Sequence, residues 1–590
     1  MINEIIPVFY ACDDNFVKYT IVSLHSMIAN ASRDRRYHVY ILHTGITDGM
    51  MQETKKLENE NFEISFEDVT SYLQSISDKL PIRDYYSRTT YYRLFIAEMY
   101  PEYQKAIYID SDTVVQGDIS KLYDTEIGDA YVGACHEQAM VQVDEYGTYV
   151  EKVLGISRYQ YYNAGILLIN CERFRKSRVL DRFVSLLHTY NFVVTQDEDY
   201  LNVICKDHVY WLDQRWNTEI FGEIPYPIGE AYILHYIMTS KPWHYSDCRH
   251  GDIFWRYAEK TSVYGEICEV LASYTDAERE RDYASCDALL ALAIKETNRE
   301  DHYMNRVNRD QRDPERVAIV RKIEEYERAG RFGEDVEDDP PGRVLMPDEI
   351  EYIRKSPADR LKSKAAYAAA RTFVGELLRS KKMIVKEIRG VEHLKALESG
   401  AIITSNHFNA FESFALQMAY EKAKISHREF YRVIREGNYT SFTGFYGTLM
   451  RHCNTLPLSS NLQTMAKFTA AVQELLAEGH LILVYPEQSM WWNYRKPKPL
   501  KVGAYTMAAK NRVPVLPCFI TMRDSEIVGE DGFPVQEYTV HISEPIYPDP
   551  NLSYRENQAN MMAKNAEVWK QIYESFYQMP LIYDTVCPMQ

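Results

Sequence analysis

Two carboxylates one residue apart close an apolar run in the first half of the chain. Asp110 and Asp112 follow the apolar residues 106–109, with only Ser111 between them. In an extended segment, this spacing directs both side chains to one side of the backbone. Such hard oxygen ligands suit Mg²⁺ or Mn²⁺, which would bridge a diphosphate and neutralise it as it leaves. Aspartates at this spacing also cap turns, so the pair alone leaves a structural role open.

A histidine and a glutamate five residues apart, His407 and Glu412, stand out in the second half. On one helix they would lie about 140° apart, so a working pair needs His407 on a loop or first turn and Glu412 in the next helix. A strand at 401–404 would deliver His407 there, with Asn406 as a candidate helix cap. Glu412 would then orient the imidazole, while His407 deprotonates an acceptor hydroxyl for attack on a thioester. Pairs at this spacing also arise by chance, which leaves a structural role open here too.

Length and composition predict a folded protein with more than one core. The 590 residues exceed the ~250–300 at which single cores stop growing. Apolar residues make up 46% and charged residues 26%, without a run of the ~18–20 apolar residues that span a membrane. The first residues include Glu4 and no basic region, so we expect no signal peptide. Ten cysteines without paired metal spacing indicate free thiols in a cytosolic protein.

The formal charge of −18 argues against a nucleic-acid-binding protein. It leaves membrane contact open, because local patches matter more than the total charge. The 47 tyrosines fit amphipathic packing and surface contact for the most part. A carbohydrate-binding or membrane-interface surface is the alternative for some of them.

Apolar runs alternate with amphipathic stretches in the first part of the chain. A helix is expected around 19–29, and four runs are predicted strands: 5–10, 37–42, 107–109 and 166–169. This alternation predicts a mostly parallel sheet with covering helices. Ligands of such sheets bind beyond the carboxyl ends of the strands, which is where Asp13, Asp110 and Asp112 fall.

The chain is expected to divide into segments 1–274, 275–345 and 346–590. The middle segment is dense in charge and ends in Pro340-Pro341-Gly342, which predicts solvated helices followed by a linker. The last segment again predicts α/β architecture, with strands at 401–404, 481–485 and 513–520. It opens with a basic amphipathic stretch at 358–382 whose cations are Arg360, Lys362, Lys364, Arg371, Arg379, Lys381 and Lys382.

An ordered series of motifs surrounds the aspartate pair. In chain order these are Asp13-Asp14-Asn15, residues 90–94, Asp110-Ser111-Asp112, residues 162–170, residues 196–202, and His235 with Lys241-Pro242-Trp243. The series resembles the family 8 glycosyltransferases, which include bacterial lipopolysaccharide galactosyl- and glucosyltransferases and glycogenin. The resemblance covers about residues 5–250.

The resemblance implies a GT-A fold, a UDP-hexose donor, Mn²⁺ or Mg²⁺, and retention of anomeric configuration. Asp110, Asp112 and His235 would be the metal ligands. Asp13 and Asn15 would meet the uridine or ribose, Arg93 would help hold the donor, Lys241 would face the diphosphate, and Asn163, Asp197 and Glu198 would line the sugar.

Two positions depart from this family's pattern. The family often has glutamine where this chain has Glu198. A carboxylate there would be a nucleophile, would stabilise an oxocarbenium-like state, or would accept a hydrogen bond from a sugar hydroxyl, and the last reading is slightly favoured. The family often has glycine where this chain has Met238, which leaves the shape of that loop open.

A second series surrounds His407. Residues 485–489 read Tyr-Pro-Glu-Gln-Ser and residues 513–517 read Val-Pro-Val-Leu-Pro. With the His407–Glu412 pair, these resemble the 1-acylglycerol-3-phosphate acyltransferases over about residues 385–540. That family's signature is HxxxxD, a phosphate-binding motif, FPEGTRS and a VPIVP-like strand. The resemblance implies an acyl-ACP or acyl-CoA donor and places Glu487 in the third motif.

Here too the departures carry information. Glu412 replaces aspartate, and Met490 replaces the basic residue of the third motif. Residues 453–460 lack the expected arginine, for which the nearby Arg451 is a candidate substitute. Losing cations weakens phosphate recognition. We therefore expect the acyl acceptor to be a hydroxyl on a sugar or glycolipid rather than a simple lysophosphatidate.

These features predict a bifunctional enzyme that adds a hexose and an acyl group to lipid or glycan acceptors. The basic stretch 358–382, and the aromatic and cationic cluster at 491–498, suit peripheral attachment to the inner face of the cell membrane. The cluster equally suits a lid or an oligomer contact. One alternative function is a glycosyltransferase with a catalytically weak, lipid-binding acyltransferase-like module. Another is a glycogenin-like protein that glycosylates its own tyrosines.

Overall fold

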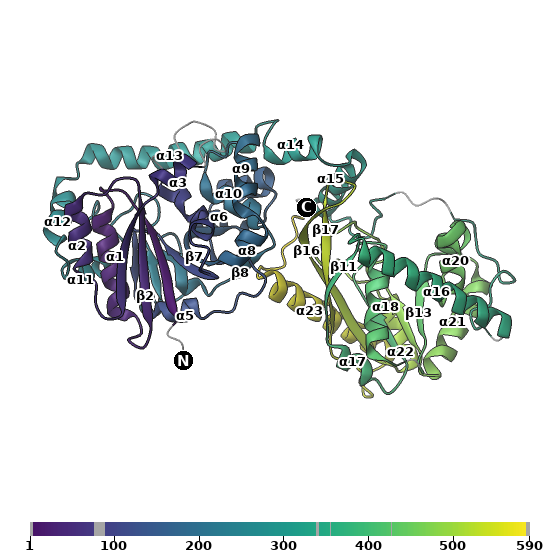
Figure 1. Ribbon diagram of the computed structural model, residues 1–590. Helices are drawn as coiled ribbons and strands as arrows, with labels where there is room; N and C mark the ends of the chain where they lie inside the picture. The colour runs from purple at the N-terminus through teal and green to yellow at the C-terminus, as the bar shows by residue number, and fades with distance from the viewer. Residues whose placement is uncertain (1–3, 76–88, 338–341, 355, 426, 586–590) are drawn as a thin grey trace. The chain divides into compact units, whose positions relative to one another are not determined.

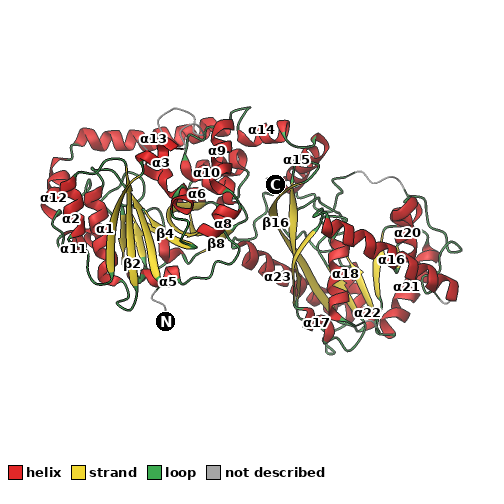
Figure 2. Cartoon of the chain, viewed as in Figure 1, coloured by secondary structure: helices red, strands yellow, loops and turns green. Residues whose placement is uncertain are grey.

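The structure is a computed structural model that describes residues 4–75, 89–337, 342–354, 356–425 and 427–585. Its internal contacts group into two compact units, residues 1–307 and 308–590. In both units, helices cover a central sheet (Figures 1 and 2). The predicted class, a GT-A α/β domain and a second α/β domain joined by a helical charged segment, is confirmed. The boundaries at 274 and 345 remain predictions.

The first unit contains a seven-stranded sheet with the order β3-β2-β1-β4-β7-β6-β8. These strands are β1 (Ile5–Ala11), β2 (Arg36–His43), β3 (Phe62–Asp68), β4 (Lys105–Ile109), β6 (Val132–His136), β7 (Tyr162–Asn170) and β8 (Val209–Trp211). β7 runs antiparallel to both β4 and β6. The ends of β1, β4 and β6 therefore share one edge of the sheet with the beginning of β7. A small ribbon of β5 (Thr113–Val115), β10 (Ile233–His235) and β9 (Thr218–Glu219) adjoins this edge.

The helices of this unit cover the sheet and carry several motif residues. They are α1 (Val17–Asn30), α2 (Asp48–Lys55), α3 (Thr70–Ser75), α4 (Ile96–Met99), α5 (Ile119–Tyr123), α6 (Gln138–Gln142), α7 (Asp144–Tyr149), α8 (Cys171–Lys176), α9 (Val179–Thr189), α10 (Asp197–Cys205), α11 (Gly251–Ala258), α12 (Tyr264–Ser273) and α13 (Asp276–Thr297). Shorter turns are η3 (Thr89–Leu94), η4 (Val150–Leu154), η5 (Arg158–Gln160), η6 (Gln214–Asn217) and η7 (Ile228–Glu230). α14 (Tyr303–Asp310) follows at the junction of the two units.

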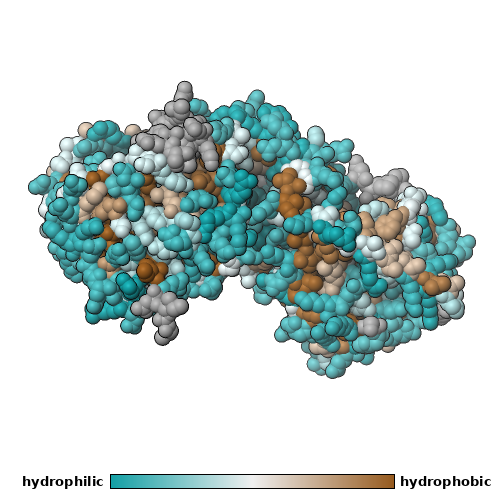
Figure 3. Space-filling view, in the orientation of Figure 1, coloured by the Kyte–Doolittle hydropathy of each residue, from teal (hydrophilic) through white to brown (hydrophobic). Residues whose placement is uncertain are grey.

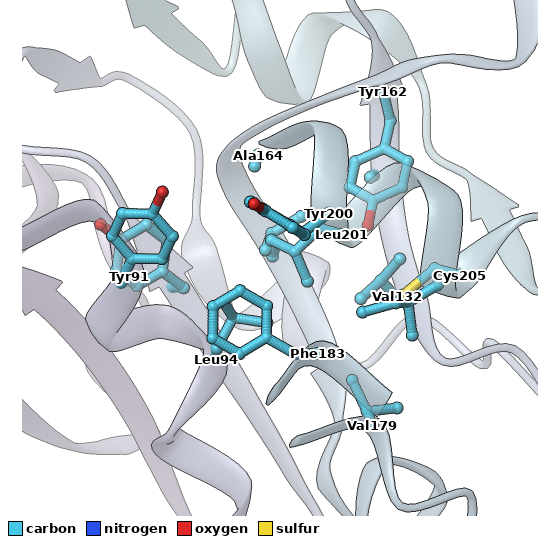
Figure 4. Packing of buried hydrophobic residues seen from close by; sticks show 14 of the residues in the cluster. Tyr91, Leu94, Val132, Tyr162, Ala164, Val179, Phe183, Tyr200, Leu201 and Cys205 are labelled. Carbon is cyan, nitrogen blue, oxygen red and sulfur yellow. The ribbon is translucent and has the colours of Figure 1, made fainter. Parts of the chain in front are cut away.

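An aromatic core fixes η3 and α10 relative to the sheet (Figure 4). The ring of Phe183 in α9 lies 5.8 Å from Tyr91 of η3 and 5.3 Å from Tyr200 of α10, centroid to centroid. All three residues are buried. Offset and edge-on aromatic contacts of this kind add about 0.5–1.5 kcal/mol each beyond area burial. The core therefore holds the two short helices that carry Arg93 and Asp197.

The second unit contains another seven-stranded sheet, with the order β11-β17-β16-β12-β15-β13-β14. Its strands are β11 (Ile384–Arg389), β12 (Ala401–Thr404), β13 (Phe430–Ile434), β14 (Thr455–Pro457), β15 (Leu481–Val484), β16 (Val515–Val528) and β17 (Pro534–Ile542). The five strands from β16 to β14 are parallel to their neighbours. Their carboxyl ends therefore meet at one edge. β17 returns antiparallel to β16.

The helices of the second unit include one that the sequence predicts as part of the linker region. They are α15 (Pro314–Arg328), α16 (Pro357–Arg379), α17 (Val391–Lys395), α18 (Glu412–Ala423), α19 (Glu436–Thr440), α20 (Gly444–His452), α21 (Leu462–Ala477), α22 (Gly503–Asn511) and α23 (Tyr554–Tyr577). Among the described residues, no helix combines the length and apolarity needed to span a bilayer.

The aromatic and cationic cluster that begins at Trp491 folds inward. The Trp491 side chain is fully buried, and its ring stacks 5.5 Å from that of Phe332 and packs against Val336. Its indole N–H donates to the carbonyl of Glu334 at 2.8 Å. The membrane-interface interpretation is therefore wrong for Trp491. Residues 331–337, which we term the docked segment, pack within the second unit and do not form a free linker, whereas Pro340 and Pro341 of the predicted linker lie outside the described residues.

Candidate active sites

Asp110 and Asp112 meet His235 at the edge of the first sheet. One ligand atom from each residue lies within 4.8 Å of the other two. Nε2 of His235 is 3.2 Å from Oδ1 of Asp112 and 3.9 Å from Oδ2 of Asp110. The expectation of an extended segment is wrong, because residues 110–112 turn from β4 into β5. This turn and the pairing of β5 with β10, which sets Thr113 opposite His235, bring the three side chains together.

The second imidazole nitrogen of His235 is held by Asn217. Its Nδ1 lies 3.1 Å from Oδ1 of Asn217, whose amide nitrogen donates to Asn163 at 2.8 Å. The Asn217 oxygen therefore accepts from Nδ1–H, and Nε2 is left facing the carboxylates. Two carboxylates and an imidazole nitrogen are suitable ligands for Mn²⁺ or Mg²⁺. The residues present fit the divalent cation that the sequence predicts.

Gly165 makes room for this group. A Cβ at that position would lie 2.3 Å from Cε1 of His235 and 2.8 Å from Oδ2 of Asp110. The carbonyl of Gly165 also accepts from the Asp110 N–H at 2.7 Å, so the two backbones are already in contact. Any side chain here would displace His235 or Asp110, two of the candidate metal ligands. The sequence analysis quotes this glycine within a motif but assigns it no role.

Lys241 lies against the metal-ligand group. Its Nζ is 2.5 Å from Oδ2 of Asp112, which is 15% exposed. Burial alone would raise the pKa of Asp112, but Lys241 and His235 lower it below its usual range. The carboxylate is therefore ionised at neutral pH. The contact of this ammonium with a donor diphosphate, which the resemblance implies, remains a prediction.

Arg93 joins two of the predicted site carboxylates. Its guanidinium lies 3.4 Å from Asp110 and 3.3 Å from Asp197, and it covers the ring of Tyr108 at 4.6 Å. The side chain is 4% exposed. Burial opposes its charge, but Asp110 and the other nearby acids raise the pKa of Arg93 above its ordinary value. Arg93 thus positions both carboxylates, and its predicted contact with the donor remains a prediction.

The predicted sugar-lining residues adjoin two acids that the sequence analysis misses. Oε2 of Glu198 accepts from the Ala164 N–H at 2.9 Å, and the Asn163 amide donates to Glu137 at 2.5 Å. Burial, followed by the charge of Glu137, raises the pKa of both Glu198 and Glu219 well above the ordinary value. Glu198 and Glu219 therefore stay protonated to a higher pH than exposed glutamates do. Protonated and ionised carboxyl groups together offer hydrogen-bond donors and acceptors, and their contact with a sugar remains a prediction.

A positional signal for Glu137 was available. It directly follows β6, just as Asp110 follows β4, and both strands end at the same edge of the sheet. Glu219 and Asn217 come from β9 and η6, where the sequence pattern predicts no strand pairing. Their proximity depends on the ribbon formed with β10.

Asp13 and Asn15 lie at the same edge, because β1 is parallel to β4. Both are exposed. Oδ1 of Asp13 accepts from the N–H groups of Asn15 and Phe16, at 3.0 and 2.9 Å, and so stabilises the start of α1. Their contacts with a nucleoside remain predictions. Met238 has φ = 55°, the left-handed conformation that glycine adopts most easily, so the loop keeps a glycine-like backbone there.

His407 and Glu412 form the predicted pair at the edge of the second sheet. His407 lies on the loop after β12, and Glu412 is the first residue of α18. Nδ1 of His407 and Oε1 of Glu412 are in hydrogen-bond contact. The imidazole is 23% exposed, whereas the carboxylate is 1% exposed. Since Nδ1 faces the carboxylate, Nε2 is the nitrogen that can take a proton from a substrate.

Backbone groups hold the Glu412 carboxylate in place. Its Oε2 accepts from the N–H groups of Phe408 and Asn409, at 2.6 and 2.8 Å. The N-cap position of α18 is Phe411, so the expected capping role of Asn406 is wrong. Asn406 instead exchanges two hydrogen bonds with the backbone of Ile520 in β16. It thereby fixes the loop that carries His407.

Glu487 joins the third motif to His407. Its Oε2 accepts from the His407 N–H at 2.9 Å, and its Oε1 accepts from the Lys498 N–H at 2.7 Å. Glu487 and Lys498 are each 2% exposed. Burial lowers the pKa of the Lys498 ammonium to about 8, although Glu487 opposes the change. The ring of Tyr485 stacks on His407, with centroids 4.3 Å apart.

The candidate phosphate-binding cation Arg451 lies in α20. Its guanidinium donates to the carbonyls of Tyr439 and Phe442, at 3.2 and 3.0 Å. The third motif is contacted by two other cations: Arg435 donates to the carbonyl of Gln488 at 3.0 Å, and Lys498 donates to the carbonyl of Ser489 at 2.6 Å. Arg451 therefore supports the 439–442 backbone, and a phosphate-binding role for it remains a prediction.

Comparisons with known proteins match two separate parts of the chain, one around each candidate site. A model of the family described as Glycosyl transferase family 8 matches residues 7–247, and one described as Acyltransferase matches residues 385–521. The lipopolysaccharide 1,2-glucosyltransferase of Escherichia coli K12 is 26% identical over 258 residues, which covers 41% of this chain and 74% of that protein. General stress protein A of Bacillus subtilis 168 is 25% identical over 283 residues, with 44% and 95% covered.

Solved structures of similar proteins include the galactosyltransferase LgtC in complex with donor and acceptor sugar analogs. That structure covers 44% of this chain and 96% of its own, with a TM-score of 0.36 and 24% identity. The motifs and the two assembled sites agree with these family matches. This chain carries a family 8 glycosyltransferase domain at residues 7–247 and an acyltransferase domain at residues 385–521.

Proposed function

We propose that this protein is a bifunctional enzyme that builds an acylated glycolipid or a related product. One domain would transfer a hexose from a UDP-sugar, with retention of configuration, to a lipid or glycan. The other would transfer an acyl group from acyl-ACP or acyl-CoA to a hydroxyl of the same or a related product. The observation that carries the proposal is the presence of two assembled polar sites in one chain. Joining them would raise the local concentration of a shared intermediate.

In the hexosyl transfer, the bond from the anomeric carbon to the leaving phosphate breaks and UDP departs. The acceptor oxygen bonds to that carbon, and its proton passes to the departing phosphate. Asp110, Asp112 and His235 would hold a cation that acts as a Lewis acid for the diphosphate. Lys241 adds a fixed positive charge there. Glu198 would accept a hydrogen bond from a sugar hydroxyl through its carbonyl oxygen, and its raised pKa favours a protonated group that could also donate one.

In the acyl transfer, Nε2 of His407 takes the proton of the acceptor hydroxyl. The acceptor oxygen attacks the thioester carbonyl, and the carbon–sulfur bond breaks to leave an ester. The departing thiolate recovers the proton from His407. Glu412 orients the imidazole and stabilises its charged form. Glu487 would act by positioning, because it holds the backbone of His407 and not the reacting atoms.

Attachment to the inner face of the cell membrane would bring lipid acceptors to both domains. Phe442, Phe445 and Tyr446 are 37%, 39% and 46% exposed, and Phe445 packs 5.2 Å from Phe373 of α16. Pale brown atoms near α16 and α20 interrupt the hydrophilic surface in Figure 3. The predicted cations of 358–382 are all exposed. Aromatic and cationic groups together suit an anionic membrane interface, which co-sedimentation with anionic and neutral vesicles would test.

The alternative is a glycosyltransferase whose second domain binds lipid but transfers acyl groups poorly. The replacements at Glu412 and Met490 favour it. To separate the two functions, we would incubate the protein with Mn²⁺, UDP-hexose, acyl-ACP and a bacterial lipid extract, and follow products by mass spectrometry. Hexose and acyl groups on one lipid would support the bifunctional enzyme. Hexose alone, unchanged in the His407→Ala variant, would support the alternative.

A further inference from the structure

A cavity of about 410 Å³ opens at the edge of the second sheet, where β13 and β14 end. These strands are parallel to β15, which is parallel to β12, so this is the edge that carries His407. Ligands of such sheets bind at this edge. The polar groups that line the cavity are Arg435, Glu436, Asn438, Ser459 and Ser460.

The cavity is physically connected to the acyltransferase motif. Nη2 of Arg435 donates to the carbonyl of Gln488 at 3.0 Å. Gln488 directly follows Glu487, whose carboxylate accepts from the His407 backbone N–H. A molecule bound in the cavity would therefore adjoin the loop that holds the catalytic histidine. Its place and size suit the headgroup of an acyl acceptor.

The cation of this cavity is already engaged by an acid of the docked segment. Asp335 accepts from both terminal nitrogens of Arg435, at 2.7 and 2.9 Å. A guanidinium offers this same two-pronged geometry to a phosphate. Asp335 thus occupies the face of Arg435 that a phosphate monoester would need. The two side chains are 38% and 42% exposed, so a ligand could reach them if the pair opened.

A second acid adds negative charge to the cavity wall. The Glu436 carboxylate accepts from the Leu345 N–H at 3.1 Å and from the Ser460 N–H and hydroxyl at 3.2 and 3.0 Å. Burial opposes ionisation, but these hydrogen bonds lower the pKa of Glu436 below its ordinary value. The cavity therefore has one carboxylate in its wall, and a second, Asp335, paired with its cation Arg435. A dianionic phosphate entering the cavity would meet repulsion, whereas neutral hydroxyl groups would find donors and acceptors.

We propose that Asp335 and Glu436 make this cavity select an uncharged, polyhydroxylated acceptor headgroup and exclude phosphate monoesters. Asp335 is thereby a specificity-determining residue contributed by the segment between the two catalytic domains. The inference rests on the proposed acyl transfer at His407, and it names the chemical class of the acceptor. A sugar headgroup fits this class, so the product of the first domain would suit the second.

The test compares two lysolipid acceptors that differ in headgroup, a hexosyl monoacylglycerol and lysophosphatidic acid. Wild-type protein should acylate the hexosyl lipid with at least tenfold higher kcat/KM. Asp335→Asn should raise kcat/KM for lysophosphatidic acid about tenfold or more, because it removes the negative charge that is paired with Arg435. Adding Arg435→Gln to that variant should abolish the gain.

The matched control is Glu337→Gln, which removes another acid of the docked segment. Glu337 pairs with Arg316 at 3.1 Å, whereas Asp335 pairs with Arg435, the cation that lines the cavity. This variant should keep the wild-type preference. Melting temperatures would show whether each variant folds. If Asp335→Asn does not fold, Glu436→Gln tests the same electrostatic exclusion of phosphate.

Binding of sn-glycerol 3-phosphate, measured by calorimetry, provides a readout independent of turnover. The wild type should show no binding at millimolar ligand, and Asp335→Asn should bind. Equal use of both lipids by wild-type protein, or no change in either readout in a folded Asp335→Asn variant, would overturn the inference. Absence of acyl transfer to any acceptor would instead contradict the proposed function. The binding measurement would still test whether the cavity excludes phosphate.

Discussion

The two candidate sites balance their buried charges in different ways. In the glycosyltransferase domain, Asp110 and Asp112 face each other across His235, and the neighbouring acids outnumber the cations Arg93 and Lys241. In the acyltransferase domain, each buried carboxylate is matched by backbone N–H groups and by one cationic or ionisable partner. We therefore expect the first site to take up a cation from solution, and the second to need none for its charge balance. The two activities should therefore respond separately to metal ions and to mutation.

The largest expected effect concerns the metal-ligand group. Asp112→Asn should reduce hexosyl transfer by about 10³-fold, because the cation loses a charged ligand and Lys241 loses its partner. Removing divalent ions with EDTA should have a similar effect on the wild type. Acyl transfer should change less than twofold in both cases. Radiolabelled UDP-hexose and a thiol-release assay would measure the two activities in parallel.

Asp48→Asn, at an exposed position in the first turn of α2, is the matched control and should leave both activities unchanged. Full hexosyl transfer by Asp112→Asn in the presence of EDTA would contradict a metal-dependent site. Equal loss of both activities would show that the two domains are not independent.

His407→Ala should affect the other activity, acyl transfer. We expect acyl transfer to fall by about 10²–10⁴-fold, because His407 is the proposed general base and Glu412 orients it. Hexosyl transfer should stay within twofold of the wild type. The measurement is kcat for thiol release from acyl-CoA with a saturating glycolipid acceptor. His427→Ala, at an exposed position, is the control, and acyl transfer unaffected by His407→Ala would remove this residue from the chemistry.

A smaller effect is expected for Glu198→Gln. Burial and Glu137 raise the pKa of Glu198, so a neutral amide resembles the protonated side chain. Hexosyl transfer should fall less than about tenfold if Glu198 only hydrogen-bonds the sugar, since a neutral hydrogen bond contributes about 0.5–1.5 kcal/mol. Glu198→Ala, which removes the group, should reduce transfer further. A loss of 10³-fold or more in the glutamine variant would instead indicate a nucleophile.

The smallest effect is on stability and depends on pH. Lys498 has a folded-state pKa of about 8, below its unfolded value, so the unfolded chain binds more protons between these two values. The free energy of unfolding should therefore rise with pH above 8, relative to Lys498→Met, by an amount on the order of 1–3 kcal/mol. Urea unfolding at pH 7 to 10, followed by tryptophan fluorescence, would measure it. The exposed Lys510→Met should lack this pH-dependent difference, and parallel curves for wild type and Lys498→Met would contradict the buried ammonium.

The sequence predicted the second site more completely than the first. Strand β12 has the predicted bounds, because a continuous apolar run flanked by polar residues leaves little freedom in a central strand. His407 and Glu412 then meet through local geometry alone, since they are five residues apart. What the sequence could not show is Asn406 bonding to Ile520, because that contact depends on β16 pairing beside β12.

The first site depends on contacts between distant segments. The pattern of apolar runs does not reveal strand direction, so it could not show that β7 is antiparallel and places Asn163 at the active edge. Glu137 and Glu219 approach each other only through β6 and the β9–β10 ribbon. The turn at 110–112 likewise depends on the pairing of β5 with β10. The resemblance supplied the identities of the ligands, but not this geometry.

Left-handed backbone at non-glycine positions also escaped prediction. Met238 has φ = 55° and Gln488 has φ = 67°, in the two domains respectively. Each lies where the corresponding family pattern has glycine. Sterics disfavour this conformation for such residues by roughly 1–2 kcal/mol. The loop shape is thus kept at both sites although the side chain differs.

The docked segment has a consequence for how this protein can be divided. Ser489 and Trp491 of the third motif donate to the carbonyls of Phe332 and Glu334, at 2.7 and 2.8 Å. A fragment that began at Met346 would lose both acceptors and expose the buried indole. A fragment that is to be exchanged by recombination or grafted onto another transferase must therefore begin before the docked segment, that is, before residue 331.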